Sequence, residues 1–193
     1  MMVTKVLRKN ETIAQLSFDL VRALNHAATT LQRTARSRRH VFNAVHDEIV
    51  GLGMRGGLAL IDETGEYLVY QVIAYPRGLR TILRGVEKLT GLRSEGFQVR
   101  VEDVDVYSEA IQTGRAIFRS ESETILKQVV PQLTPDILER LLENLGKLPV
   151  IFAPLHGEDG PEGLVSIIGK ELDESCLPAV EAFANHVAVA VQN

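Results

Sequence analysis

The sequence has a single cysteine, no tryptophan and few aromatic residues, which make up 5% of its 193 positions. A lone thiol, Cys176, excludes an internal disulfide and a multi-cysteine zinc site, and it fits a reducing compartment. The formal net charge of -4 argues against a general nucleic-acid binder, whose domain is usually basic. No stretch approaches the roughly 18 apolar residues of a membrane span, and the N-terminus lacks the apolar run of a signal peptide. These absences predict a cytoplasmic protein without direct membrane insertion.

Catalytic motifs are missing as well. The sequence contains no G-x-S-x-G, P-loop, H-E-x-x-H or C-x-x-C pattern, and its histidines fall on different predicted elements without the spacing of a metal site. The pair His46-Asp47 lies on a predicted helix, where a solvated face explains it better than a phosphoacceptor site. We therefore predict no enzyme, no metal site and no cofactor, although an unidentified small-molecule ligand remains possible.

What is present is an ordinary globular composition, with 45% hydrophobic and 24% charged residues. A chain of this length can bury about 70% of its unfolded surface, so one domain with its own core is expected. Apolar steps of three and four predict helices over 11–33, 40–52, 78–89 and 134–145, and a last helix that Asp173 caps. Two further helices are expected after Asp105 and, from a capping box of Ser120 with Glu123, after Ser120.

Strands are predicted between these helices. The clearest are two β-rich runs, 57–62 and 67–74, that flank a short polar turn and indicate an antiparallel hairpin. Shorter runs at 96–101 and 115–118 favour two more strands. The pair 150–155 and 163–169 encloses a turn rich in glycine and acidic residues, and predicts a second hairpin just before the last helix.

This last part of the sequence resembles the end of a GAF domain: two antiparallel strands, PVIFAPL and GLVSIIG, lead into the closing helix LPAVEAFANHVAVAV. The passage SEAIQTGRAIF, at 108–118, is similar to the helix, glycine and strand in the middle of that family. The resemblance implies an α+β fold with α/β/α layers. Its central antiparallel sheet would have five to six strands, with the terminal helices on one face and a helical lid over a pocket on the other. We expect an N-terminal signalling or dimerisation helix over 1–34 and the GAF domain over 35–193.

The resemblance also implies a function: a regulatory small-molecule sensor of a bacterial signalling protein, of the sensor histidine kinase type in two-component systems. Such a domain would form a homodimer and pass ligand occupancy through its terminal helices to a C-terminal effector such as a histidine kinase. One alternative is a ligand-free dimerisation and relay module whose pocket is filled by its own side chains, with the leucine-rich helix 137–145 as the filler. A more distant alternative is a thiol-dependent reductase of methionine sulfoxide, disfavoured because that chemistry uses several cysteines in this family.

Two groups of candidate residues follow. The ligand pocket would be lined by aromatic and arginine side chains, which alternatively belong to the core or to a solvated helix face: Tyr75, Arg77, Arg80, Phe97, Tyr107 and Phe118. A dimer interface would use the apolar rows of the first and last helices, whose alternative is to cover their own sheet: Leu16, Leu20, Leu24, Leu31, Val180, Val187 and Val191.

Overall fold

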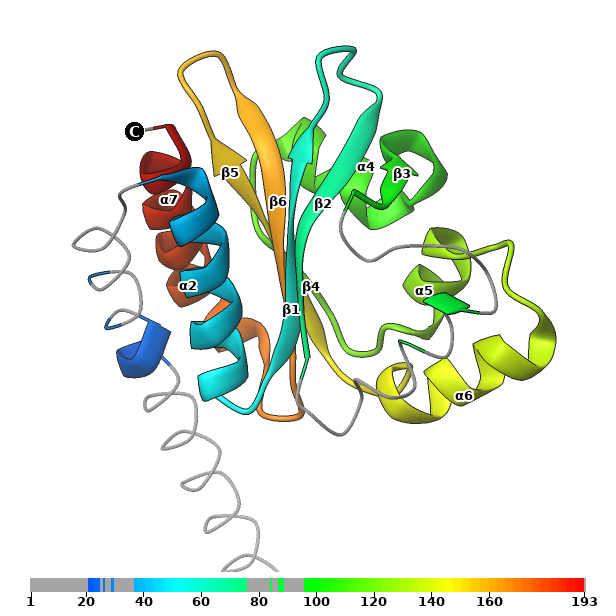
Figure 1. Cartoon of the computed structure of the whole chain (residues 1–193). Coiled ribbons are helices and arrows are strands. Elements are labelled where there is room, and N and C mark those ends of the chain that lie inside the picture. The colour runs from blue at the N-terminus through cyan, green and yellow to red at the C-terminus, as the bar shows by residue number, and fades with distance from the viewer. Residues whose placement is uncertain are drawn as a thin grey trace, which may run out of the picture.

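The structure is a computed structural model that describes residues 21–24, 26, 29, 37–75, 84, 87, 88 and 96–192. Helices and strands follow one another along the chain without a regular repeat (Figure 1). The elements are α2 (Arg38–Gly51), β1 (Arg55–Ile61), β2 (Tyr67–Ala74), β3 (Gln98–Arg100), η1 (Val101–Asp103), α4 (Asp105–Thr113), β4 (Ile117–Arg119), α5 (Glu123–Val129), α6 (Pro135–Leu145), β5 (Val150–His156), β6 (Pro161–Ile168), η2 (Glu174–Cys176) and α7 (Leu177–Gln192).

The six strands form one antiparallel sheet in the order β3-β2-β1-β6-β5-β4. Its middle pair, β1 with β6, joins the first hairpin to the last, with Gly56 opposite Ile167 and Leu58 opposite Val165. Gly56 permits a close approach here, because a Cβ at this position would lie 2.0 Å from the backbone oxygen of Ser166. The predicted α+β fold with a single antiparallel sheet of five to six strands is confirmed.

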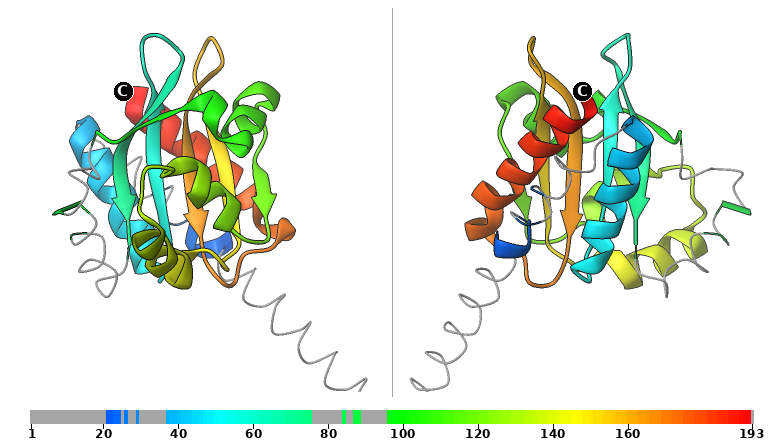
Figure 2. Two further views of the ribbon diagram at one scale, coloured as in Figure 1. Left: turned by 90° about the vertical axis from the view of Figure 1, so that its right-hand side faces the viewer. Right: turned by 60° about the vertical axis from the view of Figure 1, so that its left-hand side comes forward.

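Helices α2 and α7 cover one face of the sheet, which we call the back face (Figure 2). Strand residues alternate between the two faces, so Val165 and Ile167 of β6 point to the back while Leu164 points to the front. The back-face core includes Phe183 of α7 and Val45 of α2, which are 1% and 0% exposed. Helices α2 and α7 thus share one face, and Leu24 of the first predicted helix belongs to the same core.

The opposite, front face is covered by short elements rather than by long helices. Buried residues of α4, of α5 and of the segment between η1 and α4 pack against the sheet there, among them Val104, Ala110 and Ile125. Helix α6 lies beyond them towards one end of the sheet (Figures 1 and 2). No described residue of α6 belongs to either core cluster.

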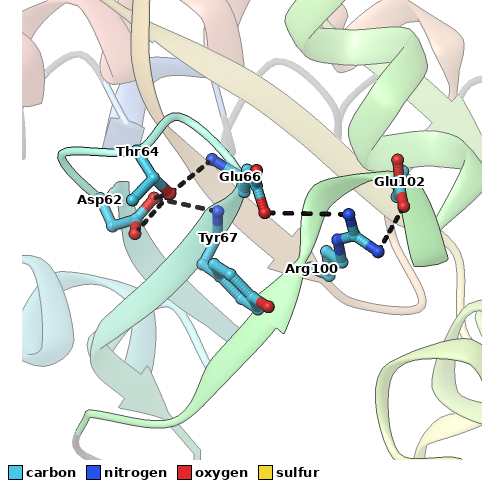
Figure 3. Close-up of polar contacts among 6 residues, drawn as sticks. All are labelled: Asp62, Thr64, Glu66, Tyr67, Arg100 and Glu102. Carbon is cyan, nitrogen blue, oxygen red and sulfur yellow. Dashed lines mark hydrogen bonds and ion pairs between the residues drawn. The ribbon is translucent and has the colours of Figure 1, made fainter.

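The tip of the first hairpin is held by side-chain hydrogen bonds and is tied to β3 (Figure 3). The Asp62 carboxylate accepts from Thr64 Oγ1 at 2.8 Å and from the backbone N–H of Tyr67 at 3.0 Å. The Tyr67 hydrogen bond is the main reason why the pKa of Asp62 lies below its ordinary value. Arg100 forms ion pairs with Glu102 at 2.6 Å and Glu66 at 3.8 Å.

The sequence predicts the ends of the helices less accurately than it predicts the strands. Pro135 begins α6 as predicted, and Gly114, with φ of 63°, ends α4. The predicted caps at Asp105 and Ser120 are wrong: Asp105 is the first residue of α4 after the N-cap Val104, and Ser122 occupies the N-cap of α5. Asp173 does cap, but it caps the short helix η2 before α7 by accepting from the N–H of Ser175.

Candidate functional site

Four aromatic side chains gather on the front face of the sheet between β2, β5 and α4. The hydroxyl groups of Tyr70 on β2 and Tyr107 on α4 lie 2.5 Å apart and share a hydrogen bond. The Tyr107 ring meets the Phe152 ring edge to face with centroids 5.3 Å apart, and the Tyr70 ring lies 6.0 Å from that of Phe97. We call these four residues the front-face aromatic cluster.

Local sequence explains how the cluster is assembled. Leu68 and Tyr70 are two positions apart on β2, so both point to the front face. On α4 the buried positions are Val106, Tyr107 and Ala110, which form the side of the helix that faces the sheet. The aromatic residues therefore come from a strand and a helix far apart in the sequence.

The two hydroxyl groups form a neutral polar pair within an apolar environment. Burial raises the pKa of Tyr107 well above its ordinary value of 10, and the neighbouring Tyr70 adds to the rise. Burial also raises the pKa of Tyr70, while its hydrogen bond with Tyr107 opposes that rise. Both phenols are therefore protonated at physiological pH, so they can donate and accept hydrogen bonds but offer no ionised base or nucleophile.

The space left within the cluster is small. A cavity of about 10 Å³ is lined by strand residues and both tyrosines: Gly57, Ala59, Leu68, Tyr70, Tyr107, Phe152, Leu164 and Ser166. This is close to the volume that one water molecule requires. Ligand pockets for drug-sized molecules measure roughly 300–1,000 Å³, so in the described part of the chain this face is filled by its own side chains.

The structure brings together only some of the predicted pocket residues. Phe97 and Tyr107 belong to the front-face aromatic cluster, while Phe118 packs against the back-face core. Tyr75 is half-buried and directly follows β2. Arg77 and Arg80 lie outside the described residues. Sequence reasoning missed Tyr70 and Phe152, although the alternation of β2 next to the predicted hairpin turn could have placed Tyr70 on this face.

Four of the predicted dimer residues lie in the described part of the chain, and all four are buried. Leu24, Val180, Val187 and Val191 are at most 5% exposed and belong to the back-face core. These side chains pack against the chain's own sheet, and their part in a dimer interface stays a prediction. Leu16, Leu20 and Leu31 lie outside the described residues.

The other candidate reactive groups give no catalytic arrangement. The Cys176 thiol is buried, with its sulfur 3.7 Å from Asp173 Oδ1, so no oxidised substrate can reach it in this structure. His46 Nδ1 lies 3.0 Å from Asp47 Oδ1 on an accessible side of α2. Within the described residues, no group of three or more His, Cys, Asp or Glu side chains is placed to hold a metal ion.

No protein-family model matches the sequence, and no curated protein matches it either. Solved structures do match its fold. A GAF domain of A. aeolicus nlh2 in an inactive state has a TM-score of 0.59 and 13% identity over 93% of this chain and 98% of its own.

Two further solved structures agree. The GAF domain of a Coxiella burnetii phosphoenolpyruvate-protein phosphotransferase has a TM-score of 0.60 and 12% identity, covering 91% of this chain and 94% of its own. The chromophore-binding domain of an R. palustris bacteriophytochrome has the same score and identity over 91% of this chain and 62% of its own. Among the helices that the structure describes, none has the length and apolar character needed to cross a membrane.

The likeness to these three solved structures shows that the chain has the fold of GAF domains.

Proposed function

We propose that this chain is a regulatory module that senses a small molecule at its front face and passes the state of that face to an effector through α2 and α7. The observation that carries this proposal is the sheet shared by the two faces. Neighbouring residues of one strand serve both sides: Phe152 belongs to the front-face aromatic cluster and Ile151 to the back-face core. A movement of the short elements that cover the front face is therefore transmitted to α7 through one layer of strand backbone.

The ligand for such a site follows from the chemistry of the cluster. Apolar rings surround one buried pair of hydroxyl groups, so a complementary molecule has a flat apolar body and one polar group that replaces the Tyr70–Tyr107 hydrogen bond. The small cavity means that binding requires α4 to move away from the sheet. The apparent affinity is then reduced by the fraction of molecules in which the face is open.

A second candidate function is a ligand-free relay, in which the filled front face serves only as a core. The cavity of about 10 Å³ favours it. The filler would be the front-face aromatic cluster and not the helix predicted from the sequence, since no described residue of α6 lies in that core. For both functions we propose a cytoplasmic homodimer attached to a signalling effector, with a histidine kinase as the leading example.

A thermal-shift screen against a metabolite library separates the two functions. Sensing predicts that at least one compound raises the melting temperature, because a ligand present at about 100 times its Kd stabilises the folded state by about 2.7 kcal/mol. Each hit is then repeated with Tyr70→Phe, which removes one hydroxyl of the pair. The matched control is Tyr67→Phe, on the same strand but outside the cluster.

For a front-face ligand we expect the shift to shrink in Tyr70→Phe and to persist in Tyr67→Phe. A library without any stabilising compound would support the relay. Hits that respond equally to both substitutions would bind elsewhere and contradict sensing at the front face.

A further inference from the structure

A polar hollow lies at the edge of the sheet, away from the front-face aromatic cluster. Its volume is about 340 Å³, and the described residues that line it come from the α4–β4 turn, from β5 and from α7: Gly114, Arg115, Pro154, His156, Glu181 and Asn185. This volume falls within the range of roughly 300–1,000 Å³ that is typical of small-molecule sites. We call this feature the edge hollow.

The edge hollow exists because β4 is shorter than its neighbour. Strand β4 pairs with β5 only from Ile117 to Arg119, opposite Phe152 to Val150. Before that point the chain turns at Gly114, so the remaining part of β5 has β6 as its strand partner on one side alone among the described residues. Pro154 suits this open edge because it has no backbone N–H that would need a strand partner.

A side chain of α7 takes the place of the missing strand pairing. The backbone N–H of Ala116, just before β4, donates to Glu181 Oε1 at 2.8 Å. This bond ties α7 to the edge of the sheet and fixes the carboxylate in the wall of the hollow. Asn185 lies one helical turn further along α7 and adds a carboxamide to the same wall.

The charges in the hollow face it without neutralising one another. Arg115 and Glu181 line the same space, yet the described residues show no ion pair between them. Glu181 uses Oε1 for Ala116, and a carboxylate has further acceptor positions on its second oxygen. The hollow therefore presents the guanidinium group of Arg115, the carboxylate of Glu181, the imidazole of His156 and the neutral amide of Asn185 around one cavity.

We propose that the edge hollow binds a small zwitterion of amino-acid size. Its carboxylate binds the Arg115 guanidinium, which can form two parallel hydrogen bonds with such a group. Its ammonium group binds the carboxylate of Glu181 and the side-chain oxygen of Asn185. The molecule would contact α7 directly, so this site acts on the closing helix independently of the front face and goes beyond the function proposed above.

The test is a ¹⁵N-resolved NMR titration of the whole chain with L-norvaline, and separately with pentanoate and pentylamine, which each carry one of its two charges. The reporter is the Ala116 amide, because its hydrogen-bond acceptor is the carboxylate that binds the ammonium group. We expect L-norvaline to shift this resonance in a saturable way. Each single-charge probe should bind about tenfold more weakly or worse, since it loses one charge-assisted contact.

Substitutions then assign the site. Arg115→Gln should weaken L-norvaline binding about tenfold, whereas Arg39→Gln, at an exposed arginine of α2 outside the hollow, should leave it unchanged. The proposal is overturned if the Ala116 resonance does not respond, if pentanoate alone binds as well as L-norvaline, or if Arg115→Gln has no effect. Shifts confined to Tyr107 and its neighbours would also overturn it, because they would place the ligand at the front face.

Discussion

At the scale of single residues, the Tyr70–Tyr107 hydroxyl pair is the main polar feature of the front face. Tyr107 is buried and Tyr70 is partly buried, and each supplies the hydrogen-bond partner that the other needs. A buried polar group without a partner loses its hydration and gains nothing in return. The two residues therefore stabilise the fold as a pair, and either hydroxyl group alone is a disadvantage.

This dependence predicts a specific pattern in a double-mutant cycle. Tyr107→Phe should lower the free energy of unfolding by about 1–3 kcal/mol, because it leaves the Tyr70 hydroxyl group buried without its partner. The double variant Tyr70→Phe/Tyr107→Phe should cost less than the sum of the two single variants, since no orphaned group remains. Urea unfolding followed by circular dichroism measures all four corners of the cycle.

Additive effects would contradict this interpretation, because they would mean that the two hydroxyl groups act independently. The Tyr67→Phe variant provides the control. It removes a phenol from the same strand but outside the front-face aromatic cluster.

At the scale of elements, the sequence predicts strands and helices better than it predicts what they contact. The hairpin of β1 and β2 follows from two β-rich runs around a polar turn, and the observed turn has the Asp62 and Thr64 hydrogen bonds that such a segment favours. Strand β4 shows the limit. It has three half-buried residues, too few for an alternation that would have placed Phe118 on the back face.

The closing helix shows a second limit. Its apolar row with steps of three and four fits either a helix on its own sheet or a helix in a dimer seam, because both require the same spacing. The structure shows the first arrangement for these residues: Val180 and Val187 are fully buried against the chain's own sheet. The hydrogen bond from the Ala116 N–H to Glu181 could not be predicted from the sequence either, because the two residues are 65 positions apart.

A matched pair of substitutions on α7 tests this assignment. Val187→Ala should lower the free energy of unfolding by about 2 kcal/mol, because it removes two buried carbon atoms and leaves a small cavity. Val189→Ala, at a side chain that is 48% exposed, should change it by less than about 0.5 kcal/mol. Both values come from chemical unfolding of the two variants alongside the wild-type chain.

The assembly state of the same variants provides an independent check. If Val187 covers its own sheet, Val187→Ala leaves the molecular mass measured by light scattering unchanged at concentrations where the variant is folded. Loss of a dimer in folded Val187→Ala would restore the interface predicted from the sequence.

At the scale of the whole molecule, one sheet separates two cores with different chemistry. The back-face core is mostly aliphatic and contains no buried tyrosine among the described residues, with α2 and α7 over it (Figure 2). The front-face core contains the buried Tyr107 and the partly buried Tyr70 beneath short elements. Global stability should therefore respond to alkaline pH through the front face.

The direction of that response follows from the raised pKa values of Tyr70 and Tyr107. Tyrosines of the unfolded chain ionise near pH 10, while the folded chain keeps both phenols protonated to higher pH. Below about pH 10 both phenols are neutral in the folded and the unfolded chain, so their ionisation does not affect the free energy of unfolding. Above about pH 10 the unfolded chain releases their protons first, which stabilises the unfolded state. Each tyrosine lowers the free energy of unfolding by up to about 1.4 kcal/mol per pH unit over this range.

The measurement compares the wild type with Tyr70→Phe/Tyr107→Phe, because lysines also titrate in this range and their contribution cancels in the difference. The stability of the double variant relative to wild type should be constant up to about pH 9 and should rise steadily above about pH 10. Tyr67→Phe, again the control, tests whether any phenol would give this effect. If the relative stability stays constant up to about pH 11, the folded chain ionises these phenols as readily as the unfolded chain does. The front face would then be open to water, and the closed state described above would not dominate in solution.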